Sequence, residues 1–272
     1  MNLSASLRAA LSPSLARIDD FGIDADASAF IVATGATNRD AIFSWVAQIK
    51  AAGLWSLIRA YPMRSGQNAG TGTTVFGLGG LNSANGVLTG APLWQADGVQ
   101  FLLASGQYMT ATISSSSANY SAGAAVSMLT TGGPNSCIIG VNGTSNADAM
   151  QINDAATNVL SGGHRTVAGS TNVSTPDQAF TANSPLFTAQ GWDGSVVRRT
   201  TNGVVVTAVA TTFGGAITPF RVNSRGDAAT TGQNKRVAFA FYLVGAGSGS
   251  AATQETLRTI YKATLGVGLG LP

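Results

Sequence analysis

The stretch SVVRRTTNGVVVTAVATT, residues 195–212, decides the fold class of this chain. Asn202-Gly203 stands between two runs rich in β-branched residues. Asn-Gly is favoured in two-residue type I′ hairpin turns because both turn residues need a positive φ. Asp193-Gly194 marks a second turn just upstream. Residues 186–212 are therefore predicted to form an antiparallel meander.

Further strand-like runs, each bounded by turn residues, accompany this meander. They are residues 98–113, 124–131, 136–143, 149–154 and 236–245. One face of the last run is predicted to carry four large apolar residues of a core strand: Val237, Phe239, Phe241 and Leu243. Many strands, tight turns and no alternation of strands with helices predict a mainly β, antiparallel sandwich.

Both ends of the chain carry helical patterns instead. A closing helix over 251–266 is predicted from apolar residues at helical spacing: Leu257, Ile260, Tyr261 and Leu265. Near the start, a first helix is expected to begin at Asp24 or Asp26 and to end at Gly35. A second is predicted from another set of spaced apolar residues: Ile42, Trp45, Val46 and Ile49.

These patterns divide the chain into four predicted parts. Residues 1–23 are a weakly helical or extended leader, and 24–62 form a helical module that ends in a short helix from Leu54. Residues 63–92, rich in Gly, Asn and Thr, are an irregular connector with at most one short strand. Residues 93–272 form the sandwich and its terminal helix.

Composition excludes several partners. Only 10% of residues are charged, against about 25% in an average soluble domain, and the net charge is +3. Basic pairs such as Arg198-Arg199 and Lys235-Arg236 are scattered and expected at solvated strand or loop ends, so no nucleic-acid partner is predicted. No apolar run approaches the roughly 20 residues needed to cross a bilayer, so no membrane insertion is predicted. A single cysteine, Cys137, excludes an internal disulfide and is expected to be a buried, inert thiol.

Residues 24–63, DADASAFIVATGATNRDAIFSWVAQIKAAGLWSLIRAYPM, resemble a module common in structural proteins of tailed bacteriophages. Such modules have an acidic start and a helix that ends in L-K-x-x-G-L-W, followed by Y-P; here Ile49 replaces the usual Leu. In those proteins the module leads into a concanavalin A-like, laminin-G-like domain. The segment 95–111 resembles the opening strand of that domain, with Ala96 and Gln107 as departures. The segment 235–264 resembles its penultimate core strand, the following loop and the short terminal helix.

This resemblance implies a fold and a function. The fold is a concanavalin A-like jelly-roll sandwich. The function is that of a virion structural protein on the particle exterior, made in the bacterial cytoplasm, as a tail-fibre, baseplate, neck or head-surface component. Its implied partners are other virion proteins and other copies of itself, a trimer by analogy. Residues 24–62 would be the attachment module, with three aromatic residues as its candidates: Trp45, Trp55 and Tyr61.

The alternative is a receptor-recognition lectin that binds host surface glycan. Exposed aromatic rings that stack on sugars would be the expected device. The candidates for it are Trp94, Tyr108, Tyr120 and Trp192. No cofactor is predicted, although laminin-G-like domains often hold calcium with Asp side chains and carbonyls. The residues that could do so, unless they form an ordinary polar loop, are Asn142, Asn146, Asp148 and Asp154.

Catalytic apparatus is sparse in the sequence. Retaining glycosidases need two carboxyl groups about 5 to 5.5 Å apart. The E-x-D-x-E motif of laminarinase-like members is absent, and the one glutamate, Glu255, lies in the predicted terminal helix. Asp148 with Asp154 is the pair that folding could bring together, and His164 is expected in a surface loop. We therefore predict that the chain is not an enzyme, with a polysaccharide depolymerase as the further alternative.

Overall fold

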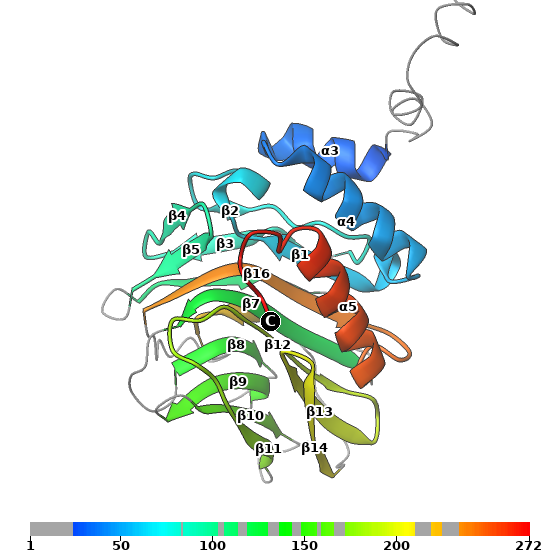
Figure 1. Cartoon of the computed structure of the whole chain (residues 1–272), viewed down its shortest axis with the longest axis vertical. Coiled ribbons are helices and arrows are strands. Elements are labelled where there is room, and N and C mark those ends of the chain that lie inside the picture. The colour runs from blue at the N-terminus through cyan, green and yellow to red at the C-terminus, as the bar shows by residue number, and fades with distance from the viewer. Residues whose placement is uncertain are drawn as a thin grey trace, which may run out of the picture.

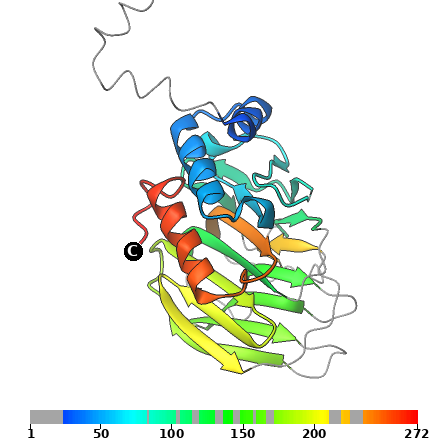
Figure 2. The same ribbon diagram turned by 90° about the vertical axis from the view of Figure 1, so that its right-hand side faces the viewer.

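The computed structural model forms two eight-stranded antiparallel sheets and a layer of helices (Figures 1 and 2). The sandwich core lies between the sheets, and the helices cover the other face of the first sheet. The predicted fold class is confirmed. The structure describes residues 24–82, 84–102, 106–113, 119–129, 136–142, 148–156, 159–165, 172–209, 219–224 and 234–272.

The first sheet is built around β16, the strand predicted from the run 236–245. Its order is β14-β13-β12-β7-β16-β5-β4, with β1 also paired to β16. One side of β16 is paired with β7, and the other side is shared by β5 and β1. The strands are β1 (Ile58–Pro62), β4 (Leu93–Gln95), β5 (Gly98–Phe101), β7 (Tyr120–Leu129), β12 (Leu186–Trp192), β13 (Val196–Thr201), β14 (Val204–Val209) and β16 (Lys235–Val244).

The second sheet has the order β11-β10-β9-β8-β15-β6-β3-β2. Large side chains from both sheets fill the space between them, and Tyr61 stacks on Phe220 with ring centroids 5.8 Å apart. The strands are β2 (Thr74–Val75), β3 (Gly86–Thr89), β6 (Tyr108–Ala111), β8 (Ser136–Asn142), β9 (Asp148–Ala156), β10 (Val159–Arg165), β11 (Asn172–Ala179) and β15 (Phe220–Val222).

Three α-helices, α3 (Ala25–Thr34), α4 (Arg39–Ala51) and α5 (Ala251–Ala263), accompany the first sheet. Asp24 caps α3 through its side chain, and Gly35 ends the helix with a φ of 68°, as predicted. Ser250 caps α5. An apolar stripe along α5 packs against the aromatic side chains of β12 and β16, and Tyr261 stacks on Phe239 at 4.4 Å. The predicted closing helix is therefore confirmed.

The two faces of β16 contribute side chains to two different hydrophobic cores. Phe239, Phe241 and Leu243 face the helices, while Tyr242 faces the second sheet. Val237 also lies on the second-sheet side, contrary to the prediction that it shares a face with the phenylalanines. Register shifts on both sides of Val237 explain this difference, because an extra residue in one strand reverses the alternation.

The predicted meander is present as β12, β13 and β14. Asn202 and Gly203 have φ values of 49° and 85°, as a type I′ turn requires. Asn202 also accepts a hydrogen bond from the backbone of Phe187, so the turn is fixed to the neighbouring strand.

The segment from Leu54 to residue 92 differs from its prediction. The expected short helix is limited to a 3₁₀ turn, η1 (Trp55–Leu57), and the next five residues form β1. Pairing with β16 favours a strand here, because Ile58 and Ala60 then face the helices while Tyr61 enters the sandwich core. The expected connector contributes β2 and β3 to the second sheet, together with a second 3₁₀ turn, η2 (Ser65–Gln67).

Candidate functional site

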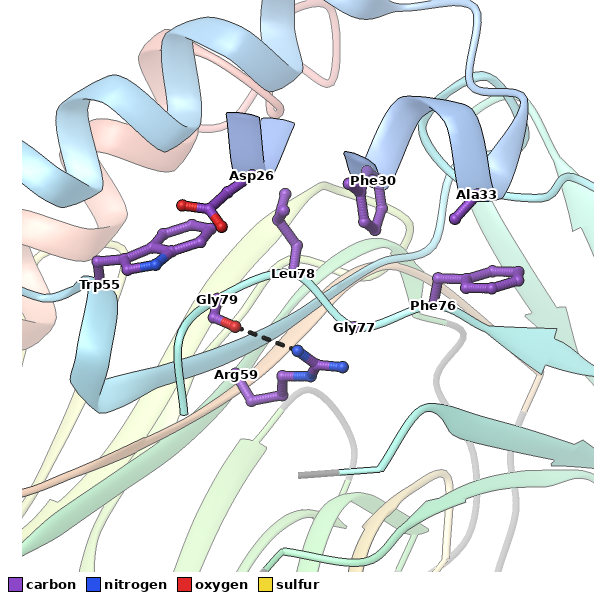
Figure 3. A pocket seen from close by; sticks show the side chains of 9 residues that line it. All are labelled: Asp26, Phe30, Ala33, Trp55, Arg59, Phe76, Gly77, Leu78 and Gly79. Carbon is purple, nitrogen blue, oxygen red and sulfur yellow. Dashed lines mark hydrogen bonds between the residues drawn. The ribbon is translucent and has the colours of Figure 1, made fainter. Parts of the chain in front are cut away.

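A pocket of about 170 Å³ opens between α3, η1, β1 and the segment that follows β2 (Figure 3). Its wall combines aromatic rings with two charged side chains. The residues that line it are Asp26, Phe30, Ala33, Trp55, Arg59, Phe76, Gly77, Leu78 and Gly79. None of the helices that the structure describes is long and apolar enough to cross a membrane.

One wall of the pocket is a strip of backbone, residues 77–80, which we call the glycine strip. It lies beside β1, with Leu78 and Ala60 exchanging backbone hydrogen bonds of 2.7 and 2.8 Å. A methyl group on Gly77 would overlap Nε of Arg59, and one on Gly79 would overlap the carbonyl oxygen of Ile58. The strip can approach β1 this closely only because these positions carry no side chain.

Arg59 brings a positive charge to the pocket from β1. Its Nη1 donates to the carbonyl of Gly79 at 3.1 Å, and its Nη2 donates to Oδ1 of Asn85 at 3.3 Å. Its Nε is buried and makes no hydrogen bond within the described part of the chain. Burial lowers the pKa of Arg59, and the nearby Tyr61 partly opposes this. No described carboxylate lies within ion-pair distance of Arg59.

Trp55 forms the aromatic side of the pocket, and its orientation is fixed by neighbours. The Nζ of Lys50 lies 4.9 Å from the centroid of its ring, and Trp45 packs against it edge-on with centroids 6.4 Å apart. A side chain on Gly80 would press against the indole. The ring is therefore partly exposed yet held in place.

The three aromatic residues predicted for attachment have different environments. Trp45 and Tyr61 are fully buried, Trp45 under the helices and Tyr61 between the sheets. The hydroxyl of Tyr61 donates to the carbonyl of Ala84 at 3.0 Å. These two residues hold the module against the sandwich, whereas Trp55 lines the pocket.

The four aromatic residues predicted for sugar binding do not form one exposed surface, although Tyr120 and Trp192 are paired across β7 and β12. Tyr120 and Trp192 belong to the sandwich core, so neither offers an open ring face. Trp94 is partly exposed and donates to the carbonyl of Gly72 at 3.0 Å. Tyr108 is partly exposed and lies 5.7 Å from the guanidinium of Arg221. Arg59 was not a candidate from the sequence, because the residues that line the pocket with it come from separate segments.

The calcium candidates do not form one site in the backbone. Asn142 and Asp148 are paired residues of β8 and β9. Asp154 lies opposite Ser136, six residues further along β9, which corresponds to about 20 Å of strand. Asn146 lies outside the described residues. No group of three or more His, Cys, Asp or Glu suited to a metal occurs in the described chain. Asn142 and Asp148 are therefore neighbours, whereas Asp154 lies too far along the strand to share one calcium ion with them.

The same separation applies to the proposed carboxyl pair, Asp148 and Asp154, which lie too far apart on one strand to flank a glycosidic bond. His164 is in β10, paired with Met150 and Val173, rather than in a loop.

Two basic residues expected at solvated positions are fully buried. Arg199 donates to Oε1 of Gln178 at 3.0 Å and to the carbonyls of Leu160 and Pro176. Burial lowers the pKa of Arg199 to about 10. Lys235 donates to the carbonyl of Cys137 at 2.7 Å, and Cys137 is buried as predicted. Both cations tie one sheet to the other.

Comparison with solved structures identifies the fold. Trypanosoma rangeli sialidase in complex with 2,3-difluoro-KDN matches with a TM-score of 0.56 and 10% identity, covering 84% of this chain and 40% of that one. The same sialidase with sialic acid matches with a TM-score of 0.55 and 11% identity, covering 84% and 39%. The binding domain of botulinum neurotoxin DC, in complex with SialylT, matches with a TM-score of 0.51 and 9% identity, covering 75% and 51%.

The chain thus spans about two fifths of the sialidase and half of the toxin domain. No protein-family model and no curated protein sequence matches it. The prediction that the chain is not an enzyme is contradicted, because sialidases are glycosidases and stand among the structures most similar to it. The solved structures and this chain share a β-sandwich fold, of the type found in these glycan-binding proteins.

Proposed function

We propose that this chain binds glycans, and that the pocket between α3 and the glycine strip is its binding site. The fold supports this, since the solved structures that share it include complexes with sialic acid and with SialylT. The observation that carries the proposal is the presence, in one pocket, of a fixed indole and a guanidinium.

These groups suit the chemistry of a sugar. A pyranose has an apolar face formed by C–H groups and a rim of hydroxyls. The ring of Trp55 can pack against the face, as aromatic rings do with apolar surfaces. Asp26 and Arg59 offer an acceptor and donors for the hydroxyls. The pocket is smaller than the roughly 300 to 1,000 Å³ of drug-sized ligand sites, so it fits one sugar residue and leaves the rest of a glycan outside.

We further propose that the protein acts on the exterior of a tailed-bacteriophage particle. The resemblance of residues 24–63 to a phage module supports this setting, as does a low charge that limits repulsion between neighbouring copies. Its partners would be virion proteins and other copies of the chain, in a trimer. The outer face of α3, where Val32 is 85% exposed, would contact these partners. Trp45 and Tyr61 would not contact them, because both side chains are buried.

The binding proposal is tested by screening the purified full chain on an array of bacterial-envelope and sialylated glycans. Trp55→Leu is compared with Trp94→Leu, which alters a second partly exposed tryptophan outside the pocket. We expect retained binding for Trp94→Leu and a loss of about tenfold for Trp55→Leu, the size of effect that one aromatic contact gives.

Equal losses in the two variants, or none in either, would move the site away from the pocket. Absence of any binding by the folded chain would refute the proposal. The setting is tested separately by labelling particles with an antibody to the chain in electron microscopy. Label on the tail or head supports display, and its absence from particles contradicts it.

A further inference from the structure

We propose that the pocket selects a sugar that carries a carboxylate, with Arg59 binding the carboxylate and Trp55 supporting the ring. This inference rests on the proposed glycan-binding function and adds the chemical class of the ligand. Within the described residues Arg59 has no carboxylate partner, and it lines the pocket together with the fixed ring of Trp55. The pocket has room for a single sugar.

The first argument concerns the donors of Arg59. A guanidinium has five N–H groups, and all of them seek acceptors when the side chain is partly buried. The carbonyl of Gly79 and Oδ1 of Asn85 accept two of these N–H groups, and the hydroxyl of Tyr61 lies nearby. Three neighbours cannot engage all five donors. A further acceptor entering the pocket would therefore gain hydrogen bonds.

The second argument concerns charge. The other pocket charge, Asp26, already pairs with Lys50 at 2.5 Å. Lys50 also pairs with Asp24 at 2.7 Å, so the carboxylates here are directed to Lys50 and not to Arg59. In the described part of the chain, the guanidinium donates hydrogen bonds to two neutral acceptors, the carbonyl of Gly79 and Oδ1 of Asn85. A ligand carboxylate would supply the missing counter-charge, and planar carboxylates match the guanidinium fork.

The third argument concerns access. In Figure 3 Arg59 lies along the backbone of Gly77 and Gly79, while Leu78 points away toward Phe30. A methyl group added at Gly77 would overlap Nε of Arg59, so the guanidinium can take this position only because residue 77 has no side chain. In that position Arg59 lines the same pocket as Phe30, Trp55 and Phe76.

The test uses two sugars that differ only at C6, methyl β-glucuronide and methyl β-glucoside. Their binding to the full chain is measured by calorimetry or ligand-observed NMR. We expect the glucuronide to bind about tenfold more tightly, the effect of one charge-assisted contact. Arg59→Gln should remove this preference, so that the two sugars bind equally. The control Lys262→Gln removes an exposed positive charge from α5 and should keep the preference.

Several results would overturn the inference. One is a preference for the glucuronide that survives in Arg59→Gln. Another is tighter binding of the 6-sulfate of the glucoside, which would assign the pocket to sulfated sugars. If Arg59→Gln fails to fold, Arg59→Lys is measured instead. This variant keeps the charge without the planar fork, so the preference for the glucuronide should fall several-fold. An unchanged preference in Arg59→Lys would also refute the inference. Binding of neutral sugars alone refutes the carboxylate and leaves glycan binding intact, whereas binding of no sugar refutes both.

Discussion

The ammonium of Lys50, in the last turn of α4, lies 2.7 Å from the carboxylate of Asp24, the residue that caps α3. The same carboxylate accepts hydrogen bonds from the backbone N–H groups of Asp26 and Ala27. One side chain thus begins a helix and joins it to the next. This contact keeps α3 over the glycine strip, and therefore shapes the pocket.

Asp24→Ala should lower the free energy of unfolding by about 1 to 2 kcal/mol, because it removes a helix cap together with an ion pair. Asp26→Ala removes only a more exposed ion pair and should cost less than about 1 kcal/mol. Urea denaturation of both variants measures the difference. Equal losses would mean that the cap contributes little.

Substitutions in the glycine strip should be more harmful than those at other glycines with positive φ. Gly79 has a φ of 132°, and an added methyl group would overlap the carbonyl of Ile58. Gly72 has a φ of 72° with open space around it. We expect Gly79→Ala to cost more than about 2 kcal/mol and Gly72→Ala about 1 kcal/mol, as measured by urea denaturation. A similar cost for both would show that the strip can move away from β1.

Acid should weaken the turn before β13. Burial alone would raise the pKa of Asp193, but hydrogen bonds from the backbone of Val196, from Arg198 and from Ser195 lower it to about 2. The usual pKa of Asp is about 3.9, so the folded state binds this proton less readily than the unfolded state. The stabilisation is therefore fully present above about pH 4 and is lost as the pH falls toward 2.

We expect wild type to lose about 1 kcal/mol more than Asp193→Asn between pH 5 and pH 2, after allowance for solvent screening. Asp40→Asn is the control, since Asp40 is exposed at the start of α4. Parallel pH profiles of wild type and Asp193→Asn, from urea denaturation, would contradict the assignment.

Truncation tests whether the helical module folds apart from the sandwich. A chain that begins at residue 63 lacks β1, and with it the partner of Phe239–Leu243 in β16 and the buried ring of Tyr61. We expect this chain to expose apolar surface and to bind the dye ANS. A chain that begins at residue 24 is the control and should melt as the full chain does. Cooperative melting of the shorter chain, without dye binding, would support two independent domains.

The parts of the fold that the sequence predicted are those set by local pattern. Asn202-Gly203 specifies its turn through backbone conformation, and the apolar stripe of the terminal helix specifies its buried face. The strand at 58–62 was missed because pairing with β16, far away in the chain, overrides the local helical preference of its neighbours.

The candidate site was less predictable for the same reason. Arg59 and Trp55 are close in sequence, but the strip that completes their pocket becomes significant only when its glycines are seen against β1. Likewise, nothing local distinguishes the buried Arg199 from the adjacent Arg198, which pairs with Asp193. The hydrogen-bond partners of Arg199 come from β10 and β11.

The antiparallel pairing of β1 with β16 also has a mechanical meaning. Any tension applied to the helices at the start of the described chain would pass through β1 into the central strand of the first sheet. For a pull directed along β1, the hydrogen bonds of the five paired residues would share the load and rupture together. A protein held by its amino-terminal region would, in this arrangement, resist detachment through its first sheet.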